Sequence, residues 1–272
     1  MILSSITHIS FAQVSNSKAE EYLKLASENE VNGDNNQAAF FFDKAANIYW
    51  QLNDIDNALL YFGKALSNSK KIGNTNGIKV IYTNLGLIYS DKNNYKQAVE
   101  SFSEALAASR KLGRKADIAA SLLNLSSAQI EIADYSGAEK SLNEVQKIAQ
   151  EINDQKILKN CYFNFNKLYE KLGNQTKSEE YFNLFAMLTK KIQAEELKAK
   201  ELKAMQMVDS AGRVVQQISA EKDITTKKLA ETNQELQEKE TTLLEVERLT
   251  KEQQMQIELL NTEMQLRDAQ LK

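Results

Sequence analysis

The sequence of 272 residues contains no proline and only one cysteine, one histidine and one tryptophan. The absence of proline permits long uninterrupted helices and excludes proline-rich linkers and turns. A single cysteine, Cys161, excludes an internal disulfide bond and a cysteine-cluster metal site. We interpret Cys161 as a small apolar core residue beside Tyr162 rather than as a reactive thiol, and cysteine usage leaves the redox compartment open.

Groups that could carry out catalysis are also scarce. The one histidine, His8, lies near the amino terminus, so histidine-based proton transfer, catalytic triads and histidine metal ligation have no candidate in the rest of the chain. The nine glycines stand singly and form no phosphate-binding loop. Carboxylate pairs such as Glu195 and Glu196 are typical of solvated helix faces. We therefore expect no enzyme activity, no cofactor and no metal.

Strong charge of one sign and long apolar runs are missing as well. A formal net charge of −3 gives no basic face for nucleic acid or for an anionic membrane surface. The sequence has no run of about 18 apolar residues, so we expect no membrane span within this chain.

What the sequence does contain is a repeated helical pattern, clearest between residues 81 and 113. Apolar and small residues recur there at the spacings i, i+3, i+4 and i+7 on two segments, so each segment places one stripe on one helix face. Small residues in the stripes allow two antiparallel helices to approach closely, and the large ones fill the remaining space. The stripe residues are Tyr82, Leu85, Gly86 and Tyr89, followed by Ala98, Phe102 and Ala105.

The same hairpin pattern recurs with a period of about 40 residues. The preceding copy has Phe42, Ala45, Ala46 and Tyr49 with Ala58, Phe62 and Ala65. The following copies have Leu122, Leu125, Ser126 and Gln129 with Ala138, Leu142 and Val145, then Tyr162, Phe165, Asn166 and Tyr169 with Ser178, Phe182 and Phe185. The expected ends of the second helices, Gly33, Gly73, Gly113 and Asn153, keep this period, and glycine and asparagine accept the left-handed C-cap conformation most readily.

The order of a large residue, a Leu-small pair and an aromatic residue, then Ala, Phe and Ala, resembles the tetratricopeptide (TPR) repeat family. The period exceeds the usual TPR length of about 34 residues by roughly one and a half helical turns, which resembles the extended repeats of bacterial peptide-responsive regulators and of adaptor proteins in G-protein signalling. The resemblance covers about 165 residues. It implies an all-α fold, a right-handed superhelix of about four helix pairs with an amino-terminal capping helix.

Repeat helices are expected over residues 36–52, 55–72, 76–91, 95–112, 116–132, 135–152, 156–172 and from 175 onward. A capping helix is expected from Ser17 to Asn32, with Tyr22 and Leu25 in the packing register, so that residues 17–192 form the array. Residues 1–13 are harder to place. The small-x-small arrangement from Ser10 to Ala12 favours the remnant of a secretory signal peptide, and the alternative is the remnant of a first-helix partner for the capping helix.

A long helix with weak heptads is expected over residues 193–272. Gln193 stands where the period predicts a helix stop, and the following residues are strong helix formers, with one expected kink at Ser210 to Gly212. One line of a coiled-coil seam contains Leu229, Leu236, Leu243, Ile257, Met264 and Leu271. Its companion line is mostly polar, so a homodimer through this helix would be weak, and the alternative is a solvated single helix.

The groove of the superhelix is the expected binding surface. Two residues after the first large residue of three repeats stand Asn84, Asn124 and Asn164, whose amides can donate to and accept from a peptide backbone, whereas the first repeat has Lys44. Extended TPR proteins that bind peptides have asparagines at what looks like the same place. Residues expected to share the groove are Thr83, Leu87, Leu123, Ser127, Phe163 and Lys167.

These features predict a non-enzymatic module that binds a protein or peptide in the groove. The order of possible export signal, repeat array and long helix resembles the sensory region of bacterial TPR-containing membrane signalling proteins of the histidine-kinase type, and implies an exported, periplasmic location. The alternative is a stand-alone cytoplasmic adaptor that uses the long helix to oligomerise. The sequence names neither the ligand nor the output.

Overall fold

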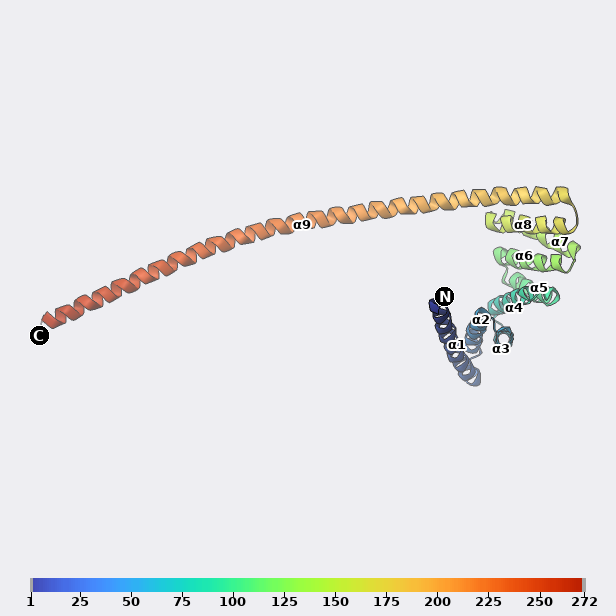
Figure 1. Cartoon of the computed structure of the whole chain (residues 1–272), viewed down its shortest axis with the longest axis horizontal. Coiled ribbons are helices and arrows are strands. Elements are labelled where there is room, and N and C mark those ends of the chain that lie inside the picture. Colours follow the sequence, from blue (N-terminus) through green and yellow to red (C-terminus); the bar gives the residue numbers. More distant parts are fainter. Residues whose placement is uncertain (1, 271–272) are drawn as a thin grey trace. The chain divides into compact units, whose positions relative to one another are not determined.

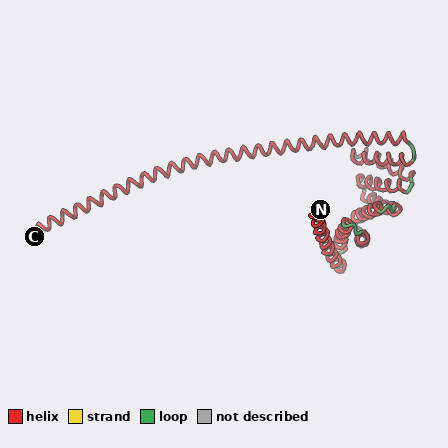
Figure 2. Tube along the Cα trace, in the orientation of Figure 1, coloured by secondary structure: helices red, strands yellow, loops and turns green. Residues whose placement is uncertain are grey.

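The computed structural model describes the backbone of residues 2–270 and the side chains of residues 16–264. Every regular element in that part is a helix, joined to the next by a short turn (Figure 2). The helices, labelled in Figure 1, are α1 (Ile2–Val31), α2 (Asn35–Gln51), α3 (Ile55–Lys71), α4 (Thr75–Asp91), α5 (Tyr95–Leu112), α6 (Lys115–Glu131), α7 (Tyr135–Glu151), α8 (Gln155–Lys171) and α9 (Gln175–Gln270). The prediction of an all-helical fold with a long carboxy-terminal helix is confirmed.

A residue with a positive φ lies in each turn between helices, at every twentieth position from Gly33 to Gly173. The predicted stops Gly33, Gly73, Gly113 and Asn153 have φ values of 78°, 66°, 71° and 53°, as a left-handed C-cap requires. The turns inside each hairpin use the same conformation, at Asn53, Asn93, Ala133 and Gly173. The predicted bounds of α2 to α8 are confirmed to within one residue, because these turns fix both ends of each helix.

The residue after each left-handed position starts the next helix. In the turn after α2, the main-chain N–H of Asp54 donates to the carbonyl of Tyr49, and the Asp54 carboxylate accepts from the N–H of Asn57. One short segment therefore satisfies the end of one helix and the beginning of the next. Aspartate or asparagine occupies this place in every turn except at Arg114, which has no capping side chain and pairs instead with Asp117 in the first turn of α6.

Packing in α4 differs from the predicted stripe. The buried residues there are Ile81, Gly86 and Ile88, while Tyr82 and Tyr89 are only half-buried. Ile81 and Ile88 belong to the core shared by α1 to α4. The helix α4 is therefore rotated about its axis, so that the residues one position before Tyr82 and Tyr89 face the preceding helix pair. Tyr89 still packs against the cluster of Ala98 and Phe102, as predicted, although it is only half-buried.

A similar shift occurs at the start of α9. Phe182 keeps the period of Phe62 and Phe102, yet it is 54% exposed. Tyr181 takes its place and stacks on Phe165 with ring centroids 4.5 Å apart. Within the described residues α9 continues as a single helix and no second helix packs on its other side, so the residue one position earlier makes the better contact with α8.

At the amino-terminal end, α1 begins at Ile2 and not at Ser17, with no proline and no glycine before Gly33 to interrupt it. Since α1 has no turn, residues 2–13 do not form a separate antiparallel partner. The side chains of residues 1–15 lie outside the described residues, so the predicted signal remnant at 1–13 remains a prediction. In the described part of α1, Ala19 and Ala26 are buried against α2, whereas Tyr22 and Leu25 are half-buried.

The chain divides into two compact units, residues 1–196 and 197–272. The second unit consists only of the later part of α9, which continues through Gln193 and through Ser210 to Gly212 without interruption. Every described side chain from residue 197 to residue 264 is exposed, including the predicted seam residues Leu236 and Leu243, and Leu271 lies outside the described residues. In the part of the chain that the structure describes, no helix is long and apolar enough to span a membrane.

Candidate peptide-binding groove

The first helices of the four pairs, α2, α4, α6 and α8, line adjoining surface hollows. One of about 200 Å³ lies between α4 and α6. The next, of about 350 Å³, lies between α6 and α8. A third, of about 650 Å³, is lined by α1, α2 and α4. Asn84 contributes to the first and third hollows and Asn124 to the first and second, so the three form a continuous surface, here named the groove.

The amides of Asn84 and Asn124 are half-buried in the groove and have no hydrogen-bond partner among the described residues. Asn164 differs, because it is only 9% exposed. Its Nδ2 donates to the carbonyl of Leu123 and to Ser126 Oγ, both at 3.2 Å, which ties α8 to α6. Two of the three predicted asparagines therefore present unused donors and acceptors to a ligand.

The other predicted residues in the α6–α8 hollow are Leu123, Ser127 and Phe163. Leu123 is 9% exposed and forms part of the core, whereas Phe163 is 39% exposed and offers an apolar surface. Lys167 places its Nζ 4.9 Å from the centre of the Phe163 ring, at the rim. An exposed aromatic ring beside unpartnered amides is the combination that holds a peptide by both backbone and side chain.

Two more predicted residues belong to α4. Thr83 lines the hollow between α4 and α6, but its hydroxyl donates to the carbonyl of Lys79 at 2.9 Å and so is engaged within the helix. Leu87 is 37% exposed and lies outside the three hollows. Thr83 therefore belongs to the groove wall with its hydroxyl proton already engaged, whereas Leu87 lies beside the groove.

Sequence reasoning missed a second row of residues, four positions before the asparagine places. One helical turn separates each of them from its asparagine or lysine counterpart, so both rows lie on the same helix face. The period that identified the asparagines would also have identified this row. Its members are Phe40, Val80, Ala120 and Asn160.

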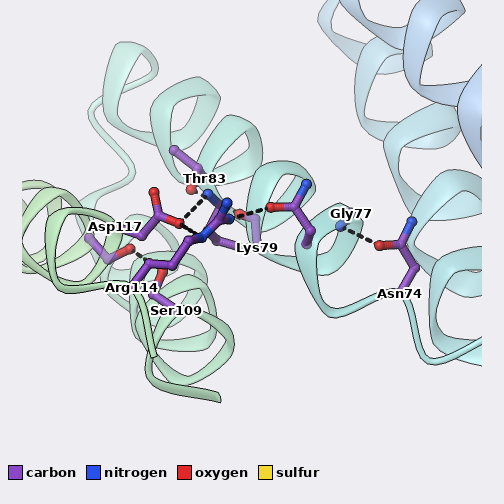
Figure 3. Close-up of polar contacts among 9 residues, drawn as sticks. Asn74, Gly77, Lys79, Thr83, Ser109, Arg114 and Asp117 are labelled. Atoms are coloured by element: carbon purple, nitrogen blue, oxygen red, sulfur yellow. Dashed lines mark hydrogen bonds and ion pairs between the residues drawn. The ribbon is translucent and has the colours of Figure 1, made fainter. Parts of the chain in front are cut away.

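A charged cluster missed by the sequence reasoning lies in the wall of the α4–α6 hollow (Figure 3). Asp117 Oδ2 lies 3.1 Å from Lys79 Nζ and 2.7 Å from Arg114 Nε, contacts that bring opposite charges together without well-aligned hydrogen bonds. Arg114 also donates to Asn76 Oδ1 at 2.7 Å. The Lys79 and Asp117 side chains are 16% and 27% exposed, so their pairing joins adjacent repeats in a site partly shielded from water.

Reactive groups do not gather in the groove. Cys161 is fully buried and its thiol donates to the carbonyl of Leu142, and burial raises the pKa of this thiol to about 12. That supports its interpretation as a core residue. Among the described residues no group of three metal-ligating side chains occurs.

Two family models, each described as a tetratricopeptide repeat, match the sequence. One matches residues 77–151, which include most of α4 and all of α5 to α7, and the other matches residues 43–71 in α2 and α3. The chain contains tetratricopeptide repeats. No curated protein matches the sequence.

Solved structures support the same architecture. BtubC (BKLC) from P. vanneervenii has a TM-score of 0.54 at 17% identity, over 68% of this chain and 91% of that one. Aspartyl phosphate phosphatase F from Bacillus subtilis has a TM-score of 0.55 at 17% identity, over 67% of this chain and 49% of that one. A Signal Transduction ATPase with Numerous Domains from Pyrococcus horikoshii is described as having a TPR sensor. It has a TM-score of 0.57 at 21% identity, over 70% of this chain and 30% of that one. At these identities the similarity establishes the superhelical TPR fold alone.

Proposed function

We propose that the TPR array is a non-enzymatic module whose groove binds an extended peptide segment of a partner protein. The observation that carries this proposal is the pair of half-buried amides of Asn84 and Asn124, which have no partner among the described residues. A polar group that is partly buried and makes no hydrogen bond costs free energy, so these two amides favour a ligand that hydrogen-bonds to them. Exposed Val80 and Phe163, 38% and 39% exposed, supply apolar contacts on either side. TPR repeats generally act as scaffolds for protein partners.

Replacing both asparagines should weaken peptide binding. Decapeptides selected from a random display library against the immobilised full chain provide the probes. Each lost hydrogen bond removes about 0.5–1.5 kcal/mol, so Asn84→Ala combined with Asn124→Ala should weaken binding roughly tenfold or more, measured by fluorescence anisotropy. The matched control combines Asn143→Ala with Asn183→Ala, exposed positions on the second helices. Equal loss in both double variants, or a selection that yields no binder, would refute groove binding.

We further propose that this chain is the ligand-sensing and dimerising part of a signal-transduction protein. The supporting observation is that α9 is one continuous helix from the α8 interface into the segment with the heptad line. A peptide that alters the packing of neighbouring repeats could shift α9 and so change pairing between two copies of that segment. The Pyrococcus horikoshii protein, described as having a TPR sensor, offers a parallel at the level of fold only.

Interrupting α9 at Gln193, where the repeat period predicts a helix end, should uncouple peptide binding from dimerisation of the long helix. We expect the full chain to form a weak dimer by sedimentation equilibrium, with a dissociation constant that changes when a selected peptide is added. A six-residue Gly-Ser insertion after Gln193 should abolish that change, because glycine and serine do not transmit helix rotation or displacement. Peptide affinity and dimerisation without peptide should persist. A chain that stays monomeric, or an insertion that leaves the response intact, contradicts the coupling.

A further inference from the structure

A pocket of about 300 Å³ lies between α2 and α4, adjoining the groove at its amino-terminal end. Its lining includes Phe40, Asp43, Asn74 and Val80, and Asp43 is its only charged residue. Asp43 lines the neighbouring hollow too, so the pocket opens beside the path proposed for the peptide. We name it the Asp43 pocket.

The carboxylate of Asp43 is incompletely satisfied. Its Oδ1 is buried and has no hydrogen-bond partner among the described residues. Such an atom costs free energy in a folded protein unless something that binds there compensates for it. Burial raises the pKa of this carboxyl group, and the nearby positive charge of Lys44 and the amide of Asn47 oppose that rise. The nearest repeats provide no equivalent, since Thr83, Leu123 and Phe163 stand at the corresponding places.

The rest of the pocket suits a flat cation. Phe40 is 51% exposed and Val80 is 38% exposed, so the lining offers an aromatic face and an aliphatic surface. Lys44 Nζ lies 5.2 Å from the centre of the Phe40 ring, so the ring face accommodates a positive charge, and an incoming guanidinium would take the place of Lys44 there. The side chains of Asn36 and Gln37 have no hydrogen-bond partner among the described residues and add amide oxygens that can accept.

We propose that the Asp43 pocket binds an arginine side chain of the peptide in the groove, in preference to lysine. A guanidinium has five N–H donors and a plane that stacks on aromatic rings, so it can meet the Asp43 carboxylate that lines the pocket, the amide oxygens and the Phe40 face together. An ammonium group presents a single compact charge. This inference rests on the proposed peptide-binding function and adds to it a specificity for one basic residue.

The direct test uses two small probes that do not depend on any selected peptide. N-acetyl-arginine methylamide should bind the full chain in saturation-transfer NMR, and the matching citrulline compound, its neutral isostere, should bind at least fivefold more weakly. Asp43→Asn should remove the difference, whereas Asp91→Asn, a loss of the same charge at an exposed position of α4, should retain it. Equal binding of both probes to the wild type overturns the proposal.

The selected decapeptides provide the second test. They should be enriched in arginine at one position, and replacing that arginine with citrulline should weaken binding to the wild type about tenfold while changing binding to Asp43→Asn little. Lysine enrichment would overturn the preference for guanidinium. Peptides that need Asn84 and Asn124 but carry no basic residue would overturn this inference and leave the proposed function standing. Failure to select any peptide would refute the proposed function, and the two small probes would still decide the pocket.

Asp43→Asn should also leave the protein folded. A raised carboxyl pKa means that the folded state binds the proton more tightly than the unfolded chain does, so this group favours folding most at low pH and loses that contribution as the pH rises through the raised pKa. The charged groups near it are Lys44 and, across the adjoining hollow, Lys18. At neutral pH the neutral amide should therefore give a melting temperature no lower than that of the wild type, which makes a loss of arginine binding interpretable.

Discussion

Phe165→Ala should destabilise the carboxy-terminal part of the array by about 3–5 kcal/mol, the largest effect we expect from a single substitution. The Phe165 side chain is fully buried, and its ring stacks on Tyr181 at 4.5 Å and on Tyr169 at 6.1 Å between centroids. These aromatic contacts join α8 to the beginning of α9. Truncation removes the buried apolar surface and leaves a cavity that the rigid stack cannot close.

Denaturant unfolding followed by circular dichroism should show this loss. Phe182→Ala is the matched control, because Phe182 is 54% exposed on α9 and its truncation should change stability by no more than about 0.5 kcal/mol. The single tryptophan, Trp50 in α2, reports on the other end of the array. Since each repeat contacts mainly its neighbours, the Trp50 fluorescence transition should move less than the circular dichroism transition. Equal effects of the two phenylalanine variants would contradict the packing described here.

Gly86→Ala should be the second most damaging change, at about 1–3 kcal/mol. A Cβ at this position would lie 2.4 Å from Phe102 Cε1 and 2.5 Å from Phe102 Cδ1. Phe102 is 2% exposed, so its ring has no open space into which it can move. The helix pair α4 and α5 must then separate, or the ring must leave its favoured rotamer.

Gly63→Ala is the natural control for this substitution. Gly63 is an exposed helical glycine in α3, and a Cβ added there would meet no atom within 4 Å, so alanine should stabilise the protein by about 0.5–1 kcal/mol through helix propensity. Adding Phe102→Leu to Gly86→Ala should recover part of the loss in a double-mutant cycle of unfolding free energies. If Gly86→Ala and Gly63→Ala shift stability in the same direction, the close approach of α4 and α5 is refuted.

The sequence predicted helix ends better than helix rotations. Positions such as Gly33 and Asn153 carry a local conformational requirement, so their period could be found without knowing any tertiary contact. Which side of α4 faces the core depends on its neighbours, because Ile81 and Tyr82 are both large and adjacent. Periodicity alone could not choose between them, and the same ambiguity placed Phe182 in the core instead of Tyr181.

The groove was predictable as a surface and less so as chemistry. A period of about 40 residues brings Asn84 and Asn124 to equivalent places, and the structure gives both a place in the groove. Asn164 occupies an equivalent position, yet its amide nitrogen is engaged because Ser126 and the carbonyl of Leu123 lie within reach. The pocket at Asp43 could not be predicted from the sequence, where Asp43 is one acidic residue among many. It depends on burial of the Asp43 carboxylate beside residues of another helix.

In most turns a left-handed residue is followed by an aspartate or asparagine. These residues lie outside the groove, so the number of repeats and the residues that bind a partner can change independently. The turn after α2 completes its own hydrogen bonds between Tyr49 and Asn57, so a hairpin copied by duplication within a gene together with such a turn carries the hydrogen-bond partners of its ends with it. Repeat number could therefore change during evolution while groove residues diverged independently, and a designer could lengthen this protein by whole hairpins with the turn after α2 as the joint.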